Sequence, residues 1–511
     1  MKKKNLLIKW IFITFLLGLL AQCLVISLTQ TMCVDEFLTL ISISDPSLKH
    51  SIKGISYGIN GTPPLYFIIT WAFYKIGIHS VIFFKLFSWL GFIGSLVLQL
   101  KYYSKRYNYW NVAVILIFLF GTSKLVYFHN AELRYYSFFF FFVTLSIISS
   151  FLLVENPRSV KHSLLFGSAI LACCFTHIYG TIYSIAILIS FLIYFFIIKK
   201  IYWTFIWLTL IGPVTFFIFW GKQLVLQSEI GVPHSPFPVP GIFHLTRAFF
   251  DLFPFGTYAF NYLPQLLSYV IIFSVCAILL VLSSNYLFKI KKKKESGSFQ
   301  EAYKIILGIN LFFIPVCVSF FISHFTVSIF EARYFLPSLL STVLLSIVLL
   351  NKINIPGRQI FIKAVLLLSF MKLAQSFISF NTGKKMLMMF EQISKTDSDG
   401  IIFEYVEGFL AMNYYVKNGK AIYPMDWRIA VDTSNGLHPV SAYKIMLRLK
   451  ELYGTEGILS STQIFQPNSI YYVIDDPAHN WYETYLAQGA FSLMQTFTAP
   501  DGSIIRKIKV N

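Results

Sequence analysis

The chain has 511 residues, of which 56% are hydrophobic and only 13% are charged, and its mean hydropathy is +0.66. A water-soluble fold of this length needs a polar shell, so this composition excludes one and indicates that lipid surrounds most of the chain. The six cysteines lie mostly in apolar segments and imply neither a disulfide framework nor a thiolate metal site.

Long uncharged runs recur through the first three quarters of the sequence. A bilayer core needs roughly 20 mostly apolar residues per helix, and by that criterion roughly eleven runs qualify as transmembrane helices. The predicted spans are residues 6–30, 80–100, 111–128, 136–154, 163–178, 181–198, 203–220, 265–288, 304–323, 334–350 and 360–380. The first follows three lysines, but it is too long for a signal peptide and lacks a cleavage site, so we interpret it as a membrane anchor.

Basic residues fix the orientation of these spans. Lys and Arg of short loops are retained on the cytoplasmic side. They gather in every second gap: Lys2–Lys4, Lys101/Lys105/Arg106, Arg158/Lys161, Lys199/Lys200, Lys289–Lys294 and Lys352/Arg358. The pattern predicts a cytoplasmic N-terminus and an external C-terminus.

The net charge of +19 therefore reports mainly on topology, with attraction to anionic membrane lipids as a by-product. Because the Lys289–Lys294 run sits between two spans, no nucleic-acid partner is expected.

The first external loop, residues 31–79, is partly apolar. Pro63-Pro64 halts the chain, and Leu65 to Ile76 is an apolar, aromatic run too short to cross a bilayer. It predicts a helix lying at the membrane interface.

A second external loop, residues 221–264, is rich in proline and glycine. It is equally typical of a mobile gate over a membrane-level site and of an inert connector.

The sequence changes character after residue 380. Residues 1–380 are predicted to form the membrane domain and residues 381–511 a small soluble α/β domain outside the membrane. Val440 to Tyr453 has a helical period, Ser469 to Asp475 reads as a strand, and 491–498 with 504–510 flank turn residues typical of a hairpin. Nothing in this domain points to catalysis.

Charged residues at the outer ends of the spans are few. A charge near hydrocarbon costs several kcal/mol unless it is paired, hydrated or used, so each is informative. Four motifs lie on the same predicted face: Asp35-Glu36, Glu132-x-Arg134, His177-x-Tyr179 and Glu331-x-Arg333. They predict a cavity at the outer membrane level.

Such a set suits transfer of a group from a polyprenyl phosphate. A carboxylate of Asp35 or Glu36 deprotonates an acceptor hydroxyl, and a guanidinium binds phosphate oxygens through its planar fork. The alternatives stay open: the acidic pair as a hydrated helix end, His177 as a buried hydrogen-bonded histidine, and the Glu-x-Arg motifs as neutralised pairs that tie helix ends together.

Five ordered motifs resemble those of the C-type membrane glycosyltransferases. They are Val34-Asp35-Glu36, Asn60-Gly61-Thr62-Pro63-Pro64-Leu65-Tyr66, Ala131-Glu132-Leu133-Arg134-Tyr135-Tyr136-Ser137, Thr176-His177-Ile178-Tyr179-Gly180 and Glu331-Ala332-Arg333-Tyr334-Phe335-Leu336-Pro337. The similarity covers roughly residues 1–350, and the nearest branch contains protein O-mannosyltransferases, the lipid A aminoarabinose transferase and the rhizobial lipopolysaccharide core transferases.

The resemblance implies an inverting sugar transfer on the outer face of a bacterial inner membrane. It implies Asp35 as the catalytic base with Glu36 second, and Arg134 and Arg333 as ligands of the donor phosphate. The other motif residues are expected in the substrate pocket: Glu132, His177, Tyr179, Tyr135, Pro63, Pro64, Tyr66 and Glu331. One position departs from the family, since Thr62 stands where relatives usually have His or Lys before the two prolines.

The predicted function is therefore a membrane glycosyltransferase that moves a monosaccharide from undecaprenyl phosphate to a glycolipid, cell-envelope polysaccharide or protein. Arginines can assist departure of the phosphate, so no metal or other cofactor is expected. A lipid or polysaccharide transporter is the alternative, but it would place its ionisable groups near the midplane and often show repeated halves. A scaffold that presents the soluble domain would leave the loop acids dispensable.

Overall fold

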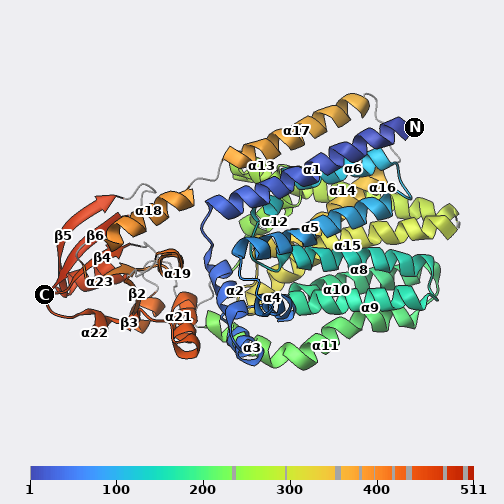
Figure 1. Ribbon diagram of the computed structural model, residues 1–511. Coiled ribbons are helices and arrows are strands. Elements are labelled where there is room, and N and C mark those ends of the chain that lie inside the picture. Colours follow the sequence, from blue (N-terminus) through green and yellow to red (C-terminus); the bar gives the residue numbers. More distant parts are fainter. Residues whose placement is uncertain are drawn as a thin grey trace.

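The computed structural model describes residues 2–129, 131–232, 237–293, 296–350, 358–378, 382–395, 398–416, 420–432, 440–475, 480–498 and 504–511. A bundle of long helices makes up one part, and a twisted sheet with short helices makes up the other (Figure 1). The predicted domain boundary at 380/381 lies outside the described residues.

Every predicted span falls on a helix. The helices are α1 (Lys2–Thr29), α5 (Val81–Tyr103), α6 (Tyr109–Thr122), α8 (Tyr136–Glu155), α9 (Val160–Thr176), α10 (Tyr179–Ile198), α11 (Trp203–Ser228), α14 (Gln265–Lys293), α15 (Ser296–Phe325), α16 (Leu339–Leu350) and α17 (Arg358–Ile378). Within the described residues, 7 helices are long and apolar enough to cross a bilayer, and Tyr109–Thr122, Val160–Thr176 and Ala332–Val348 are shorter apolar ones. The chain is a polytopic α-helical membrane protein, as predicted.

Three spans differ in their ends from the prediction. The run 111–128 breaks at Ser123, whose extended backbone separates α6 from α7 (Lys124–His129). The run 334–350 begins as the 3-10 helix η2 (Ala332–Ser338), because Pro337 lacks an N–H group to donate. Helix α11 continues to Ser228, eight residues beyond its apolar run, since residues such as Lys222 and Gln223 are good helix formers.

The first loop forms three short helices. These are α2 (Val34–Ser44), α3 (Leu48–Ser56) and α4 (Leu65–Lys75). Helix α4 follows Pro64 directly, and its 11 residues are too few to span a bilayer, which confirms the predicted short helix. The Asn60 side chain donates to Leu38 O and Ser42 Oγ, so the turn before α4 is fastened to α2.

The loop of residues 221–264 also contains short helices, η1 (Glu229–Gly231), α12 (Ile242–Asp251) and α13 (Gly256–Tyr262). Ser328 Oγ donates to Pro238 O at 2.9 Å, and Thr342 Oγ1 donates to Leu252 O at 2.9 Å. The loop therefore lies against the segment on either side of η2, next to the fourth polar motif.

The C-terminal part is an α/β domain, as predicted. Its six-stranded sheet has the order β3-β2-β1-β4-β6-β5, with β1, β2, β3 and β4 parallel and β6 antiparallel to β4 and β5. The strands are β1 (Gly400–Phe403), β2 (Ala421–Met425), β3 (Ile458–Ser460), β4 (Ile470–Ile474), β5 (Phe491–Thr498) and β6 (Ile504–Val510). The helices are α18 (Thr382–Ser394), α19 (Val406–Tyr415), α20 (Trp427–Val431), α21 (Val440–Tyr453), α22 (Ser461–Ile464) and α23 (Trp481–Ala487). The predicted strand, hairpin pairing and helix at Val440 to Tyr453 are all confirmed.

The sheet domain packs on the first loop, which contains α2, α3 and α4. Phe37 and Leu38 of α2 belong to the same buried apolar cluster as Phe390, Phe403 and Phe409. The Phe37 ring also lies edge-on to Tyr415, at 6.1 Å between ring centroids. Burial of these large side chains joins the domain to α2, at the end of the bundle that faces the sheet (Figure 1).

Candidate active site

Asp35 lies in the first turn of α2, between two arginines from distant parts of the chain. Its Oδ2 is 3.0 Å from Arg333 Nη1 and 3.5 Å from Arg134 Nη2. The Asp35 side chain is 31% exposed. The structure therefore brings together three predicted site residues that are 99 and 298 positions apart in the sequence.

Hydrogen bonds to neighbouring protein groups hold the Arg134 guanidinium in place. Its Nη1 donates to the backbone oxygen of Asp35, to Thr39 Oγ1 and to Asn60 Oδ1, at 3.1, 3.1 and 2.8 Å. The guanidinium also lies over the Tyr135 ring, 4.8 Å from its centroid. Only 5% of the Arg134 side chain is exposed, so this cation is part of the frame of the site.

Arg333 is freer than Arg134. Its side chain is 28% exposed, and its ion pair with Asp35 joins η2 to α2. The Nε atoms of both arginines are buried and have no acceptor among the described residues. Two guanidinium groups with donors to spare beside one carboxylate leave the site with an excess of positive charge, which suits an anion such as phosphate.

The pKa of the Asp35 carboxyl reflects opposing effects. Burial favours the neutral acid, but the positive charges of Arg134 and Arg333 outweigh burial and hold the pKa of Asp35 below its ordinary value. Asp35 is therefore a carboxylate at neutral pH, able to accept a hydrogen bond from a hydroxyl group.

Glu36 points the other way and is buried. Its Oε1 lies 3.0 Å from Lys85 Nζ and accepts from Leu133 N at 2.7 Å, while Oε2 accepts from Cys33 N at 3.1 Å. These contacts connect the start of α2 to α5 and to the residue next to Arg134. The geometry of Glu36 therefore fits a positioning role better than direct contact with a substrate.

Aromatic rings form one wall of the site. His177 stacks on Tyr135 at 5.0 Å and lies 4.7 Å from Tyr334, measured between ring centroids. Its Nδ1 accepts from Tyr179 N at 3.2 Å, and the Tyr179 hydroxyl donates to Ile329 O at 2.7 Å. Since Tyr135 lies under Arg134 and Tyr334 under Arg333, this wall continues from the two cations.

The other predicted pocket residues are more dispersed. Glu132 pairs with His129 at 2.9 Å, and Glu331 stands at the N-cap position of η2 without a side-chain capping hydrogen bond. Tyr66 is buried, bonds to Ser88 Oγ at 2.7 Å and lies 6.5 Å from the Tyr135 ring. The two prolines, Pro63 and Pro64, are buried at the start of α4.

Sequence reasoning missed several contributors, chiefly Lys85, Thr39 and Tyr334. A lysine inside an otherwise apolar span is a signal that was present in the sequence, because such a charge needs a partner. Asn60 and Tyr334 stand inside recognised motifs, whereas Thr39 has no signal beyond its position one turn after Asp35.

Three carboxylates in the described part of the C-terminal domain lie close enough to share a metal ion: Glu404, Asp475 and Glu483. Arg506 already pairs with two of these carboxylates, 2.7 Å from Asp475 and 3.4 Å from Glu483. A guanidinium there repels a metal cation, so the cluster fits a structural ion-pair network better than a metal site.

Fold and site together define a polytopic membrane protein with a carboxylate and two arginines at one end of its bundle. No family model matches the chain, and no curated protein matches it. Among solved structures it is similar to ArnT from Cupriavidus metallidurans, in the apo state (TM-score 0.58) and bound to undecaprenyl phosphate (TM-score 0.56). Each comparison covers 97% of both chains at 10% identity, so the chain has the ArnT fold.

Proposed function

We propose that this chain is a C-type membrane glycosyltransferase that uses a polyprenyl phosphate sugar, undecaprenyl phosphate being the expected carrier. The observation that carries the proposal is the Asp35 carboxylate held between Arg134 and Arg333, both with buried donors that no described residue accepts. The ArnT fold supports it, because one ArnT structure holds undecaprenyl phosphate.

In the proposed reaction an acceptor hydroxyl attacks the anomeric carbon of the donor sugar from the face opposite the phosphate. The bond from that carbon to the phosphate oxygen breaks, the configuration inverts, and the lipid phosphate leaves with the electron pair. Asp35 takes the hydroxyl proton, and Arg333 stabilises the charge that develops on the phosphate.

Arg333 suits phosphate better than Arg134, because it is more exposed and has fewer protein partners. When a phosphate takes the Arg333 guanidinium, Asp35 loses one neighbouring cation and the pKa of its carboxyl rises. Donor binding thus turns a weak base into a stronger one, which orders the reaction as donor first and proton transfer second.

The hydrogen bonds that hold Arg134 also bear on Thr62, the position where this chain departs from the family pattern. Relatives usually carry a cation before the two prolines, whereas here the turn that contains Asn60 and Thr62 holds Arg134 through Asn60 Oδ1. Glu36 and Lys85 position the start of α2, and the aromatic wall of Tyr135, His177 and Tyr334 faces the sugar. The site is proposed to open on the outer side of a bacterial inner membrane. The basic loops are expected on the cytoplasmic side, which places the site on the opposite side.

The test is a transfer assay with purified full-length protein, undecaprenyl phosphate sugars and cell-envelope acceptors. We expect Asp35→Asn to lower the turnover number by about 10² to 10⁴, the usual contribution of a general base. Glu155→Gln is the matched control. It removes a carboxylate at the C-terminal end of α8, whereas Arg134 stands just before the N-terminal end, so most of the activity should be kept. Equal turnover by wild type and Asp35→Asn would refute the role of Asp35, and undecaprenyl phosphate movement without sugar transfer would favour a transporter.

A further inference from the structure

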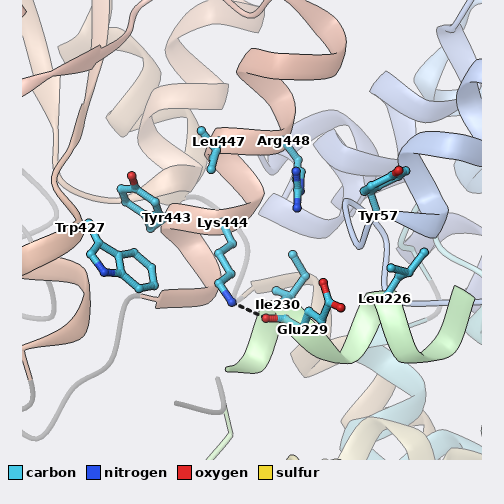
Figure 2. Close-up of a pocket in the computed structure, with 9 residues that line it drawn as sticks. All are labelled: Tyr57, Leu226, Glu229, Ile230, Trp427, Tyr443, Lys444, Leu447 and Arg448. Atoms are coloured by element: carbon cyan, nitrogen blue, oxygen red, sulfur yellow. Dashed lines mark hydrogen bonds between the residues drawn. The ribbon is translucent and has the colours of Figure 1, made fainter. Parts of the chain in front are cut away.

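A cavity of about 240 Å³ lies where the C-terminal domain meets the end of α11 (Figure 2). Its lining comes from four separate segments of the chain. Tyr57 follows α3, Leu226, Glu229 and Ile230 belong to the end of α11 and η1, and Trp427, Tyr443, Lys444, Leu447 and Arg448 belong to α20 and α21. None of these residues takes part in the site around Asp35.

The walls combine aromatic faces with charges of both signs. Trp427 is 43% exposed and lies edge-on to Tyr443 at 5.2 Å between ring centroids. Across the gap, the Arg448 guanidinium lies 5.3 Å over the Tyr57 ring, and Glu229 supplies the one carboxylate of the lining. Aromatic rings pack against the apolar C–H faces of a sugar ring, while charged side chains bond to its hydroxyl groups.

The size of the cavity restricts the ligand. Pockets for drug-sized molecules measure about 300 to 1,000 Å³, so this cavity suits a smaller unit such as one pyranose ring with the chain continuing outside. Its walls are also fixed in place, because Lys444 Nζ donates to Glu229 O and Val232 O, both at 2.5 Å. Figure 2 shows this lysine reaching from α21 across to η1.

A short series of buried hydrogen bonds joins the wall of the cavity to the residues around Asp35. Gln227, beside the lining residue Leu226, donates from Nε2 to Ile55 O at 3.0 Å and to Asn60 O at 3.4 Å. Tyr57 and Asn60 are three positions apart in the chain, a reach of at most about 11 Å, and Asn60 Oδ1 accepts from Arg134. These contacts place the cavity wall close to the residues that hold Arg134 beside Asp35.

We propose that this cavity is a carbohydrate subsite that holds one sugar unit of the acceptor, so that the acceptor is a glycan and not a bare polypeptide. The inference rests on the proposed glycosyltransferase function and names its acceptor class. Trp427 and Tyr443 supply the stacking faces, and Arg448 and Glu229 bond to the hydroxyl groups of the ring.

The experiment measures binding of detergent-solubilised full-length protein to an array of neutral and acidic cell-envelope oligosaccharides, with no donor present. We expect saturable binding to at least one oligosaccharide. Arg448→Met should weaken it about tenfold or more, the usual effect of losing a charge-assisted hydrogen bond. Trp427→Ala should also weaken it, because a stacking face is lost. Trp427→Phe keeps an aromatic face and should retain binding. Lys395→Met is the matched control, because it removes an exposed charge that pairs with Glu391.

Two outcomes overturn the subsite: no oligosaccharide binds, or Trp427→Ala and Arg448→Met bind as wild type does. Binding of undecaprenyl phosphate, measured in parallel, shows that the variants are folded and tests the proposed function separately. Asp35→Asn, which should strongly lower the rate of transfer, is expected to keep oligosaccharide binding. Loss of donor binding with intact glycan binding would refute the glycosyltransferase proposal and not the cavity.

Discussion

The carboxylates of Asp35 and Glu36 are neighbours in sequence but occupy two very different regions of the molecule. Glu36 is buried, and three donors satisfy it: Lys85, Leu133 N and Cys33 N. Asp35 is 31% exposed and stands between two arginines that keep unused donors. One carboxylate has its charge matched by one lysine, whereas the other is outnumbered by cations.

This difference separates a structural ion pair from a binding site. A matched, buried pair needs nothing else and serves to hold α2, α5 and the residue before Arg134 together. A carboxylate with surplus cations gains from a further anion. The two acids should therefore respond differently to substitution.

The largest effect is expected on the Glu36 side. Lys85→Met leaves a buried carboxylate without its cation, which typically destabilises a protein by about 3–5 kcal/mol. Thermal unfolding in detergent should show a clear drop in the midpoint. The double variant Lys85→Met/Glu36→Gln should recover part of the loss, because no uncompensated charge remains. An unchanged midpoint for Lys85→Met would show that the pair does not hold the loop.

A smaller effect is expected on the Asp35 side, and it should appear in binding. Arg333→Met removes the exposed guanidinium, and loss of a charge-assisted bond of about 1.5–3 kcal/mol should weaken undecaprenyl phosphate binding roughly 10- to 150-fold.

Arg106→Met is the matched control for Arg333→Met. Arg106 Nε donates to Glu155 Oε1 at 2.9 Å, at the far end of the 20-residue helix α8, about 30 Å from the site. We expect the Arg106 variant to bind the lipid phosphate as wild type does. Equal losses in both variants would mean that general lipid attraction explains the binding.

The smallest effect concerns pH. The pKa of Asp35 is lowered in the folded protein, so its ion pairs stabilise the fold above the unfolded-state pKa of about 3.9 and are lost as pH falls through the lower folded pKa. The difference in melting midpoint between wild type and Asp35→Asn should therefore be constant from about pH 8 to pH 5 and shrink below about pH 4. A difference that already shrinks between pH 7 and pH 5 would indicate a raised pKa.

Much of the fold could be predicted because lipid imposes a simple pattern. Apolar runs mark the helices, and the alternation of turn residues with apolar segments identified β4, the β5–β6 pairing and α21. The convergence of Asp35, Arg134 and Arg333 was also predicted, since their motifs stand at the same ends of their spans. Helix ends were less predictable, as at Ser123 and Pro337.

The sequence could not show which of the two acids, Asp35 or Glu36, forms the buried ion pair and which lies between the arginines. This assignment depends on which side chain of α5 faces the first turn of α2, and an apolar helix gives little sign of its orientation. The same holds for Glu132, which pairs with His129 instead of facing Asp35. The cavity lined by Tyr57 and Arg448 is formed by segments that are distant in sequence, so no local sequence pattern predicts it.

The ion pair between Asp35 and Arg333 also sets a condition on biosynthesis. Ribosomes add about 5 to 20 residues per second, so the 298 residues that follow Asp35 up to and including Arg333 take about 15 to 60 s to be added. During that interval Asp35 has already been synthesised, but its ion pair with Arg333, the nearer of the two arginines, cannot form. A chain that ends before Arg333 is never able to complete the site, however many of its helices have already entered the bilayer.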